Sequence, residues 1–169
     1  MDLYTASVPQ FIKMLRNLDS WLGKGIELAE RKKFDPDVLL GMRLAADQFT
    51  LARQIQSSCD TAKLTSARLT GKDAPSHADS ETTLAQLRER IASVVGWLET
   101  LGPADFAGAS ERKISAPWMR GKWGEADAYL VEYGWPNFYF HVVTAYTILR
   151  HAGVELGKIP YLGSFPFRD

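Results

Sequence analysis

Asn137 and His141 are two polar residues whose types and spacing could support chemistry. They stand four residues apart, so a helix would place both on one face about a turn apart. That is the geometry that two ligands of one metal ion need, and an amide oxygen and an imidazole nitrogen can both act as donors. The same spacing also fits two ordinary polar residues of a helix, so it defines a candidate pair.

Asp47 is a second candidate because it interrupts an apolar pattern. The pattern has helical spacing and consists of Leu40, Leu44, Asp47, Leu51, Ile55, Cys59 and Ala62. A carboxylate among core positions could orient a histidine as a general base, although no nucleophile at motif spacing accompanies it. Arg43 lies four residues before Asp47, which favours an ion pair, the alternative being that Arg43 binds an anion.

Aromatic residues surround Asn137 in the sequence, namely Trp135, Phe138, Tyr139, Phe140 and Tyr146. Such a density in a central helix favours core packing, and we expect Trp135 and Tyr139 to border any ligand pocket. Cys59 is expected to be a buried, inert thiol, since no histidine or cation accompanies it at close spacing. His77 is expected in a solvated loop, and His151 at the surface end of a helix.

Four helical segments must position these residues. A first helix begins near Ser7 and Pro9, pauses at Gly23 and Gly25, and continues over 26–33; a second runs from Asp37 to Leu69. Thr83 caps a third helix that ends before Gly102 and Pro103. After a short hairpin or extended excursion over 113–123, a fourth helix spans 126–151 with a break at 134–136.

This pattern predicts an all-α, four-helix bundle in a single domain, 1–169. Its core is expected to contain the apolar residues of helical spacing, including Leu40, Leu44, Leu51, Ile55, Leu87, Ile91, Val94, Leu98, Val142 and Ile148.

The composition excludes several classes of protein. The 20 basic and 20 acidic residues give no net charge, which argues against a nucleic-acid binder. The 17 uncharged residues between Glu132 and Arg150 are too few, and too interrupted, for a membrane span. With a single cysteine and no signal peptide at the start, we expect a cytoplasmic protein.

Motifs along most of the chain resemble a known family. The segments that carry the resemblance are Pro136-Asn137-Phe138-Tyr139-Phe140-His141, Thr144-Ala145-Tyr146, Leu149-Arg150, Gly153-Val154-Glu155-Leu156-Gly157-Lys158, Arg43-Leu44-Ala45, Leu51-Ala52-Arg53-Gln54 and Cys59-Asp60. From about residue 5 to 163, the chain is similar to an uncharacterised bacterial domain-of-unknown-function family within the DinB/YfiT-like metalloenzyme superfamily. The resemblance implies a DinB-like bundle but no particular reaction.

The superfamily holds nickel or zinc with three histidines, one on the second helix and two spaced by four on the fourth. The matching positions here are Asp47, Asn137 and His141. The resemblance therefore implies a weakly held nickel or zinc ion, or a degenerate site in which Asp47 accepts a hydrogen bond from His141, unless Asp47 faces elsewhere. Trp135, Tyr139 and Arg43 complete the expected pocket.

Two functions from different classes follow from the resemblance. One is a small-molecule enzyme or binder, by analogy with the superfamily's thiol-dependent enzymes. The other is a non-catalytic bundle that has lost its metal site and serves in homodimerisation or partner binding. A homodimer is expected in either case, since superfamily members often pair bundle faces and a chain without net charge repels itself little.

Overall fold

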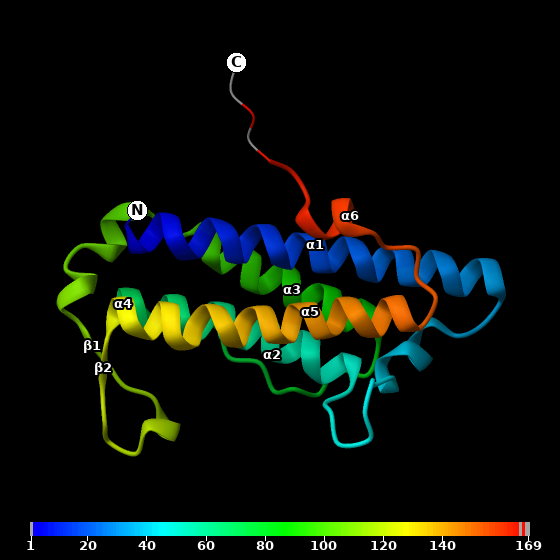
Figure 1. Cartoon of the computed structure of the whole chain (residues 1–169), viewed down its shortest axis with the longest axis horizontal. Coiled ribbons are helices and arrows are strands. Elements are labelled where there is room, and N and C mark those ends of the chain that lie inside the picture. Colours follow the sequence, from blue (N-terminus) through cyan, green and yellow to red (C-terminus); the bar gives the residue numbers. More distant parts are fainter. Residues whose placement is uncertain (1, 166, 168–169) are drawn as a thin grey trace.

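Four long helices lie side by side in the computed structural model, which describes residues 2–165 and 167 (Figure 1). They are α1 (Leu3–Lys32), α2 (Leu51–Thr70), α3 (Leu84–Glu99) and α5 (Trp135–His151). α2 packs against both α3 and α5, and α1 packs against all three. The predicted all-α, four-helix bundle is confirmed.

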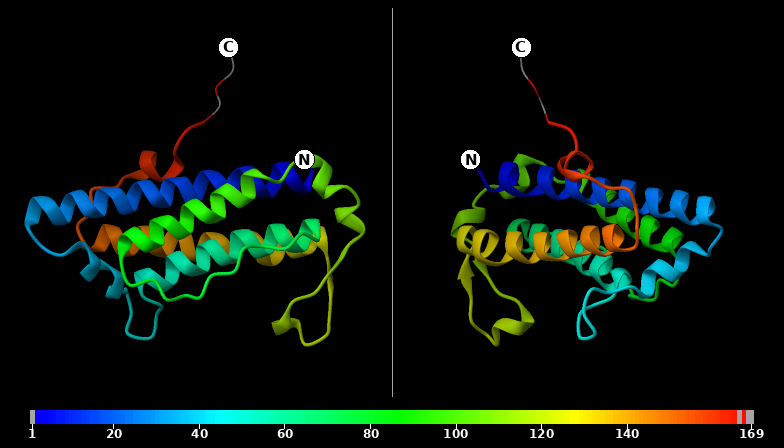
Figure 2. Two further views of the ribbon diagram at one scale, coloured as in Figure 1. Left: turned by 180° about the vertical axis from the view of Figure 1, so that it is seen from behind. Right: turned by 45° about the vertical axis from the view of Figure 1, so that its right-hand side comes forward.

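Shorter elements connect and flank these helices. They are η1 (Pro36–Gly41), η2 (Pro103–Phe106), η3 (Ala109–Glu111), β1 (Lys113–Ile114), η4 (Pro117–Met119), β2 (Gly124–Glu125), α4 (Ala126–Tyr129), η5 (Leu130–Gly134) and α6 (Lys158–Leu162). β1 and β2 form an antiparallel pair in which Lys113 lies opposite Glu125. This pair carries the predicted excursion between the third and fourth helices, which Figure 2 shows projecting from one end of the bundle.

The first helix is longer than its sequence signals predicted. Asp2 is the N-cap and accepts a hydrogen bond from the Thr5 backbone, whereas Ser7, the predicted cap, donates its hydroxyl proton to the Leu3 carbonyl 2.6 Å away. The glycines at 23 and 25 do not interrupt the helix. A glycine costs a helix only about 1 kcal/mol, and the buried face of a 30-residue helix readily outweighs that.

The second helix begins fourteen residues later than predicted. Residues 42–50 form a loop that a hydrogen bond from the Leu51 amide to the Met42 carbonyl closes at 2.8 Å. Thr50 caps α2 through the Arg53 amide, and Gln48 accepts from the Leu44 amide inside the loop. These local hydrogen bonds satisfy the chain without a helix, and Leu44, predicted to be core, is exposed.

The other predicted core residues are buried in one cluster: Leu40, Leu51, Ile55, Leu87, Ile91, Val94, Leu98, Val142 and Ile148. The third helix begins as predicted, because Thr83 and Gln86 form a reciprocal capping box. Among the described residues, no helix combines the length and the apolar character that a membrane span requires.

A wide π-helical turn replaces the predicted break before Pro136. The Trp135 amide donates to the Leu130 carbonyl five residues earlier, so α4, η5 and α5 form one continuous helix. Gly134 lies so close to α2 that an added Cβ would stand 3.0 Å from the Thr65 methyl carbon. The turn therefore brings the residues on either side of Gly134 against the face of α2.

Candidate functional site

A cavity of about 300 Å³ lies between α2 and the continuous α4, η5 and α5 helix. Its lining is mostly polar or aromatic and consists of Ser57, Asp60, Thr61, Leu64, Thr65, Arg68, Trp118, Tyr129, Tyr133, Asn137 and His141. The predicted pair of Asn137 and His141 therefore faces this cavity from α5. Trp118 reaches the cavity from the excursion, outside the four long helices.

His141 is held by a buried amide at one end of the cavity. Its Nδ1 lies 2.7 Å from Oε1 of Gln54, whose own amide nitrogen donates to the Phe49 carbonyl. That arrangement makes Nδ1 the protonated nitrogen and leaves Nε2 as a hydrogen-bond acceptor. Burial, and secondarily the nearby Arg53, lower the pKa of His141, so the imidazole is neutral at pH 7.

Asn137 forms a link between the helices. Its amide nitrogen donates to Oγ1 of Thr61 at 2.8 Å, and that hydroxyl donates to the Ser57 carbonyl. Asn137 and Thr61 thus join α5 to α2 beside His141. The amide group of Asn137 is oriented by this contact.

The opposite end of the cavity combines aromatic rings with a guanidinium. Tyr133 stacks on Tyr129 with 5.5 Å between ring centroids, and on Trp118 with 4.6 Å. Arg68 donates to the Tyr129 hydroxyl at 2.8 Å. Burial raises the pKa of Tyr133, so its phenol keeps its proton at neutral pH.

Arg68 and Trp118 are site residues that the sequence analysis missed. Thr61, Thr65 and Arg68 recur at steps of four and three, which was a readable sign of a polar face on α2. Trp118 carried no such sign, because only the folded excursion brings it to the cavity.

The structure brings together two of the six predicted pocket residues, Asn137 and His141. Asp47 lies exposed in the 42–50 loop, and the expected partner position of His141 is occupied by Gln54. Arg43 is also exposed and donates to the Ala46 carbonyl in place of the expected ion pair with Asp47. The predictions that Asp47 and Arg43 line the pocket are wrong for one reason, because the helix that was expected to carry both residues begins only at Leu51.

The two predicted aromatic residues face a different helix. The Trp135 indole donates to the Ala6 carbonyl at 3.0 Å, and the Tyr139 hydroxyl accepts from the side-chain amide of Gln10 at 2.6 Å. Both contacts are with α1, away from α2. Tyr133 and Tyr129, one and two turns before Asn137, form the aromatic wall in their place.

Replacing Asp47 with alanine should therefore change the free energy of unfolding by no more than about 0.5 kcal/mol, since the side chain is exposed. It should also leave the pKa of His141 unchanged. Chemical denaturation and an NMR titration measure both quantities. A shift in the His141 pKa in the Asp47→Ala protein would contradict the placement of Asp47 outside the site.

The residues around His141 do not fit a tightly held zinc or nickel ion. Within residues 2–165 and 167, no three His, Cys, Asp or Glu side chains gather closely enough to hold a metal ion. The amide of Asn137 is turned to donate to Thr61, and Nδ1 of His141 is taken by Gln54. One imidazole nitrogen with neutral amides and hydroxyls is a poor donor set for these ions.

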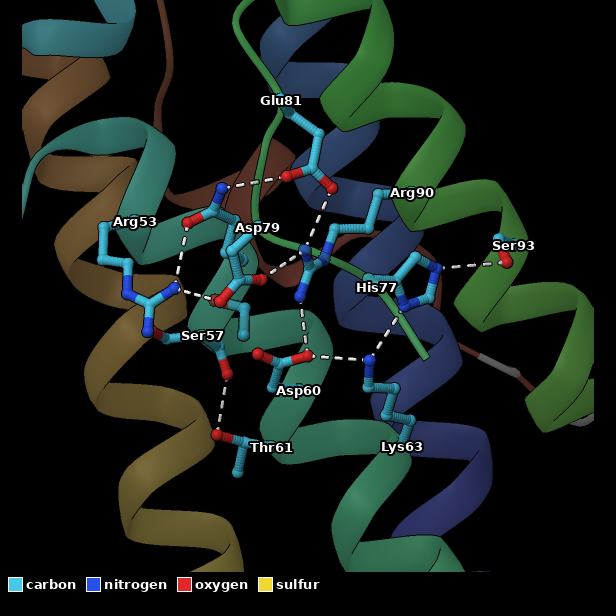
Figure 3. Close-up of polar contacts among 12 residues, drawn as sticks. Arg53, Ser57, Asp60, Thr61, Lys63, His77, Asp79, Glu81, Arg90 and Ser93 are labelled. Atoms are coloured by element: carbon cyan, nitrogen blue, oxygen red, sulfur yellow. Dashed lines mark hydrogen bonds and ion pairs between the residues drawn. The ribbon is translucent and has the colours of Figure 1, made fainter. Parts of the chain in front are cut away.

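An ion cluster around the buried Arg90 borders the cavity through Asp60 (Figure 3). Arg90 of α3 is buried and lies 2.6 Å from Asp60, 2.7 Å from Asp79 and 2.9 Å from Glu81. Burial disfavours its charge, yet hydrogen bonds to Glu81 and Asp79 and the nearby Asp60 raise the pKa of Arg90. Burial likewise opposes the charges of Asp79 and Glu81, but the guanidinium partners prevail and lower both pKa values.

The cluster extends along the 71–83 segment, which runs back beside α2 (Figure 2). Lys63 lies 2.8 Å from Asp60 and donates to Nδ1 of His77 at 2.8 Å, and Arg53 pairs with Asp79. His77, predicted to be solvated, is instead half-buried, and burial together with Lys63 lowers its pKa. No local sequence pattern indicated this cluster, because its members come from three separate segments.

Two further predictions about single residues are confirmed. Cys59 is fully buried, and burial raises the pKa of its thiol to about 12. The thiol is therefore protonated and unreactive at neutral pH. His151 is exposed at the last residue of α5.

The helical layout is that of a DinB-like bundle. A crystal structure of a DinB family member protein from Shewanella denitrificans matches with a TM-score of 0.94 and 54% sequence identity, over 99% of this chain and 95% of that one. Residues 3–162 match the family described as Domain of unknown function (DUF1993), and the chain belongs to that family. No curated protein matches the chain.

Proposed function

We propose that this DUF1993 protein binds a small organic molecule in the cavity between α2 and α5. The observation that carries the proposal is the cavity of about 300 Å³, which lies at the lower end of the size range of ligand sites. Its walls combine stacked aromatic rings with polar groups at both ends, the arrangement by which such sites fix the orientation of a ligand. Binding of this kind requires no metal ion.

His141 is the residue that we propose for proton chemistry on the bound molecule. Its neutral imidazole is oriented by Gln54, and Nε2 remains free to accept a proton or a hydrogen bond. Gln54 occupies the orienting role that the sequence analysis gave to Asp47. An uncharged amide stabilises an imidazolium less than a carboxylate does, so His141 would act as a weak base.

Filling the cavity tests the proposal. Ser57 lines the cavity, and a tryptophan there should occupy it, whereas a tryptophan at the exposed Ser20 of α1 is the matched control. A thermal-shift screen of small aromatic and polar compounds should find ligands that raise the Tm of the wild-type and Ser20→Trp proteins but not of Ser57→Trp. Leu64→Trp, at a partly exposed lining position, repeats the test if Ser57→Trp folds poorly.

Two outcomes of this screen would contradict the proposal. One is that the ligands stabilise Ser57→Trp and Leu64→Trp as well as the wild-type protein. The other is that no compound raises the Tm of the wild-type protein.

A homodimer is the second candidate role, and the exposed side of α5 favours it. Phe140 is 56% exposed and Val143 is 42% exposed, one turn apart on the same helix face. Two such faces would bury these side chains against each other in a symmetric dimer. Light scattering at micromolar concentration should give twice the monomer mass of 18.9 kDa. The Phe140→Asp protein should instead have the mass of a monomer. A wild-type monomer would contradict the proposal.

A further inference from the structure

The two ends of the cavity differ in charge, and this difference bears on the kind of molecule that it would bind. We infer that the ligand is a small planar carboxylate, with its anionic group at Arg68 and its flat group against Trp118 and Tyr133. The inference rests on the proposed function and specifies the class of ligand for the same cavity.

Arg68 carries a charge that its surroundings do not neutralise. Within the described part of the chain it forms no ion pair, and its hydrogen bond goes to the neutral hydroxyl of Tyr129. A guanidinium presents several donors in a planar fork that matches a carboxylate. An anion at this end of the cavity would therefore gain both charge pairing and directed hydrogen bonds.

The other charged residue of the lining does not compete for Arg68. Asp60 is paired with Arg90 and Lys63, within a cluster whose three cations and three carboxylates balance (Figure 3). The cavity thus offers one uncompensated positive charge. A single carboxylate matches that charge, whereas a doubly charged phosphate would leave a negative charge unpaired beside Asp60.

Thr65 supplies a second, independent observation beside Arg68. On α2 the hydroxyls of Ser58, Thr61, Ser66 and Thr70 all donate to the carbonyl four residues earlier. The Thr65 hydroxyl is buried without any hydrogen-bond partner, although its side chain lines the cavity. Buried hydroxyls are normally paired, and a rotation of the Thr65 side chain toward the cavity would let its hydroxyl donate to an oxygen of the ligand.

The flat part of the ligand is inferred from the aromatic wall. Trp118 and Tyr133 stack at an interplanar angle of 30°, and Tyr129 continues the stack. Trp118 remains 52% exposed even so, which leaves area on its ring for a further flat group. Offset stacking on such rings favours aromatic or conjugated groups over aliphatic ones.

A matched pair of probes tests the inference: 2-naphthoate and 2-naphthamide, which share size and shape but differ in charge. Calorimetry should show 2-naphthoate binding the wild-type protein roughly tenfold more tightly than the amide, as expected for a charge-assisted hydrogen bond. Arg68→Gln should weaken 2-naphthoate to the level of the amide and leave the amide unchanged. Arg120→Gln, an exposed arginine of the same excursion as Trp118, should change neither affinity.

Thr65→Val provides a second variant that keeps the volume of the side chain and removes only its hydroxyl. It should weaken both 2-naphthoate and 2-naphthamide a few-fold, because each presents an oxygen that can accept from the hydroxyl. It should not lower the Tm, since the hydroxyl has no partner to lose.

The outcomes separate this inference from the proposed function. Equal affinity of both probes in the wild-type and Arg68→Gln proteins, with binding lost in Leu64→Trp, would overturn the carboxylate inference and support the cavity as a ligand site. Binding that survives in Leu64→Trp would count against both. No binding of 2-naphthoate to the wild-type protein at millimolar concentration would overturn the inference.

Discussion

Replacing Arg90 with methionine is expected to lower the free energy of unfolding by about 3 to 5 kcal/mol. The guanidinium side chain is only 1% exposed and is shared by Asp60, Asp79 and Glu81. Methionine keeps much of the volume but leaves these carboxylates without their main partner. Charges that are partly removed from water and unpaired are costly, so the loss exceeds that of an ordinary surface ion pair.

Arg88 is the matched control on the same helix. Its ion pair with Asp19 is 2.7 Å long but considerably exposed, so Arg88→Met should cost no more than about 1 kcal/mol. Urea denaturation of the two variants measures the contrast. Equal losses would show that the cluster around the buried Arg90 does not stabilise the fold more than a surface pair does.

Replacing Leu51 with alanine should lower the free energy of unfolding by about 2 to 5 kcal/mol, through lost burial and the cavity left behind. Leu51 is fully buried at the first residue of α2. Leu44 is the control, because the sequence predicted both leucines to be core, whereas the structure leaves Leu44 43% exposed in the loop. Leu44→Ala should change the free energy by no more than about 0.5 kcal/mol.

Chemical denaturation of both leucine variants measures the two changes in the free energy of unfolding. A loss of 2 kcal/mol or more for Leu44→Ala would indicate that the 42–50 segment packs as a helix into the core. An unchanged stability for Leu51→Ala would contradict the buried face of α2.

The bundle was predictable because helical periodicity extends over its long helices. Thr83 and Gln86 fixed the start of α3, and the apolar residues of α3 are buried at the expected spacing. The start of α2 was not predictable in this way. Leu40, Leu44 and Leu51 fit a helical stripe, but the Thr50 cap and the hydrogen bond between Leu51 and Met42 favour a loop.

The site was predictable where its residues share one helix. Asn137 and His141 face the cavity as their spacing indicated. The partner of His141 could not be inferred, because α2 begins fourteen residues later than predicted, which leaves Asp47 in the loop and places Gln54 beside His141. Trp118 and the Arg90 cluster depend on contacts between distant segments, which local sequence patterns do not encode.

The state of His141 is the most direct test of a cavity faced by a neutral, oriented imidazole. An NMR titration of ¹⁵N-labelled histidine reports which ring nitrogen is protonated and at what pH the ring gains its second proton. We expect a proton on Nδ1, none on Nε2, and a pKa below the ordinary value of 6.5. A proton on Nε2 at neutral pH, or a pKa at or above 6.5, would contradict the proposed site.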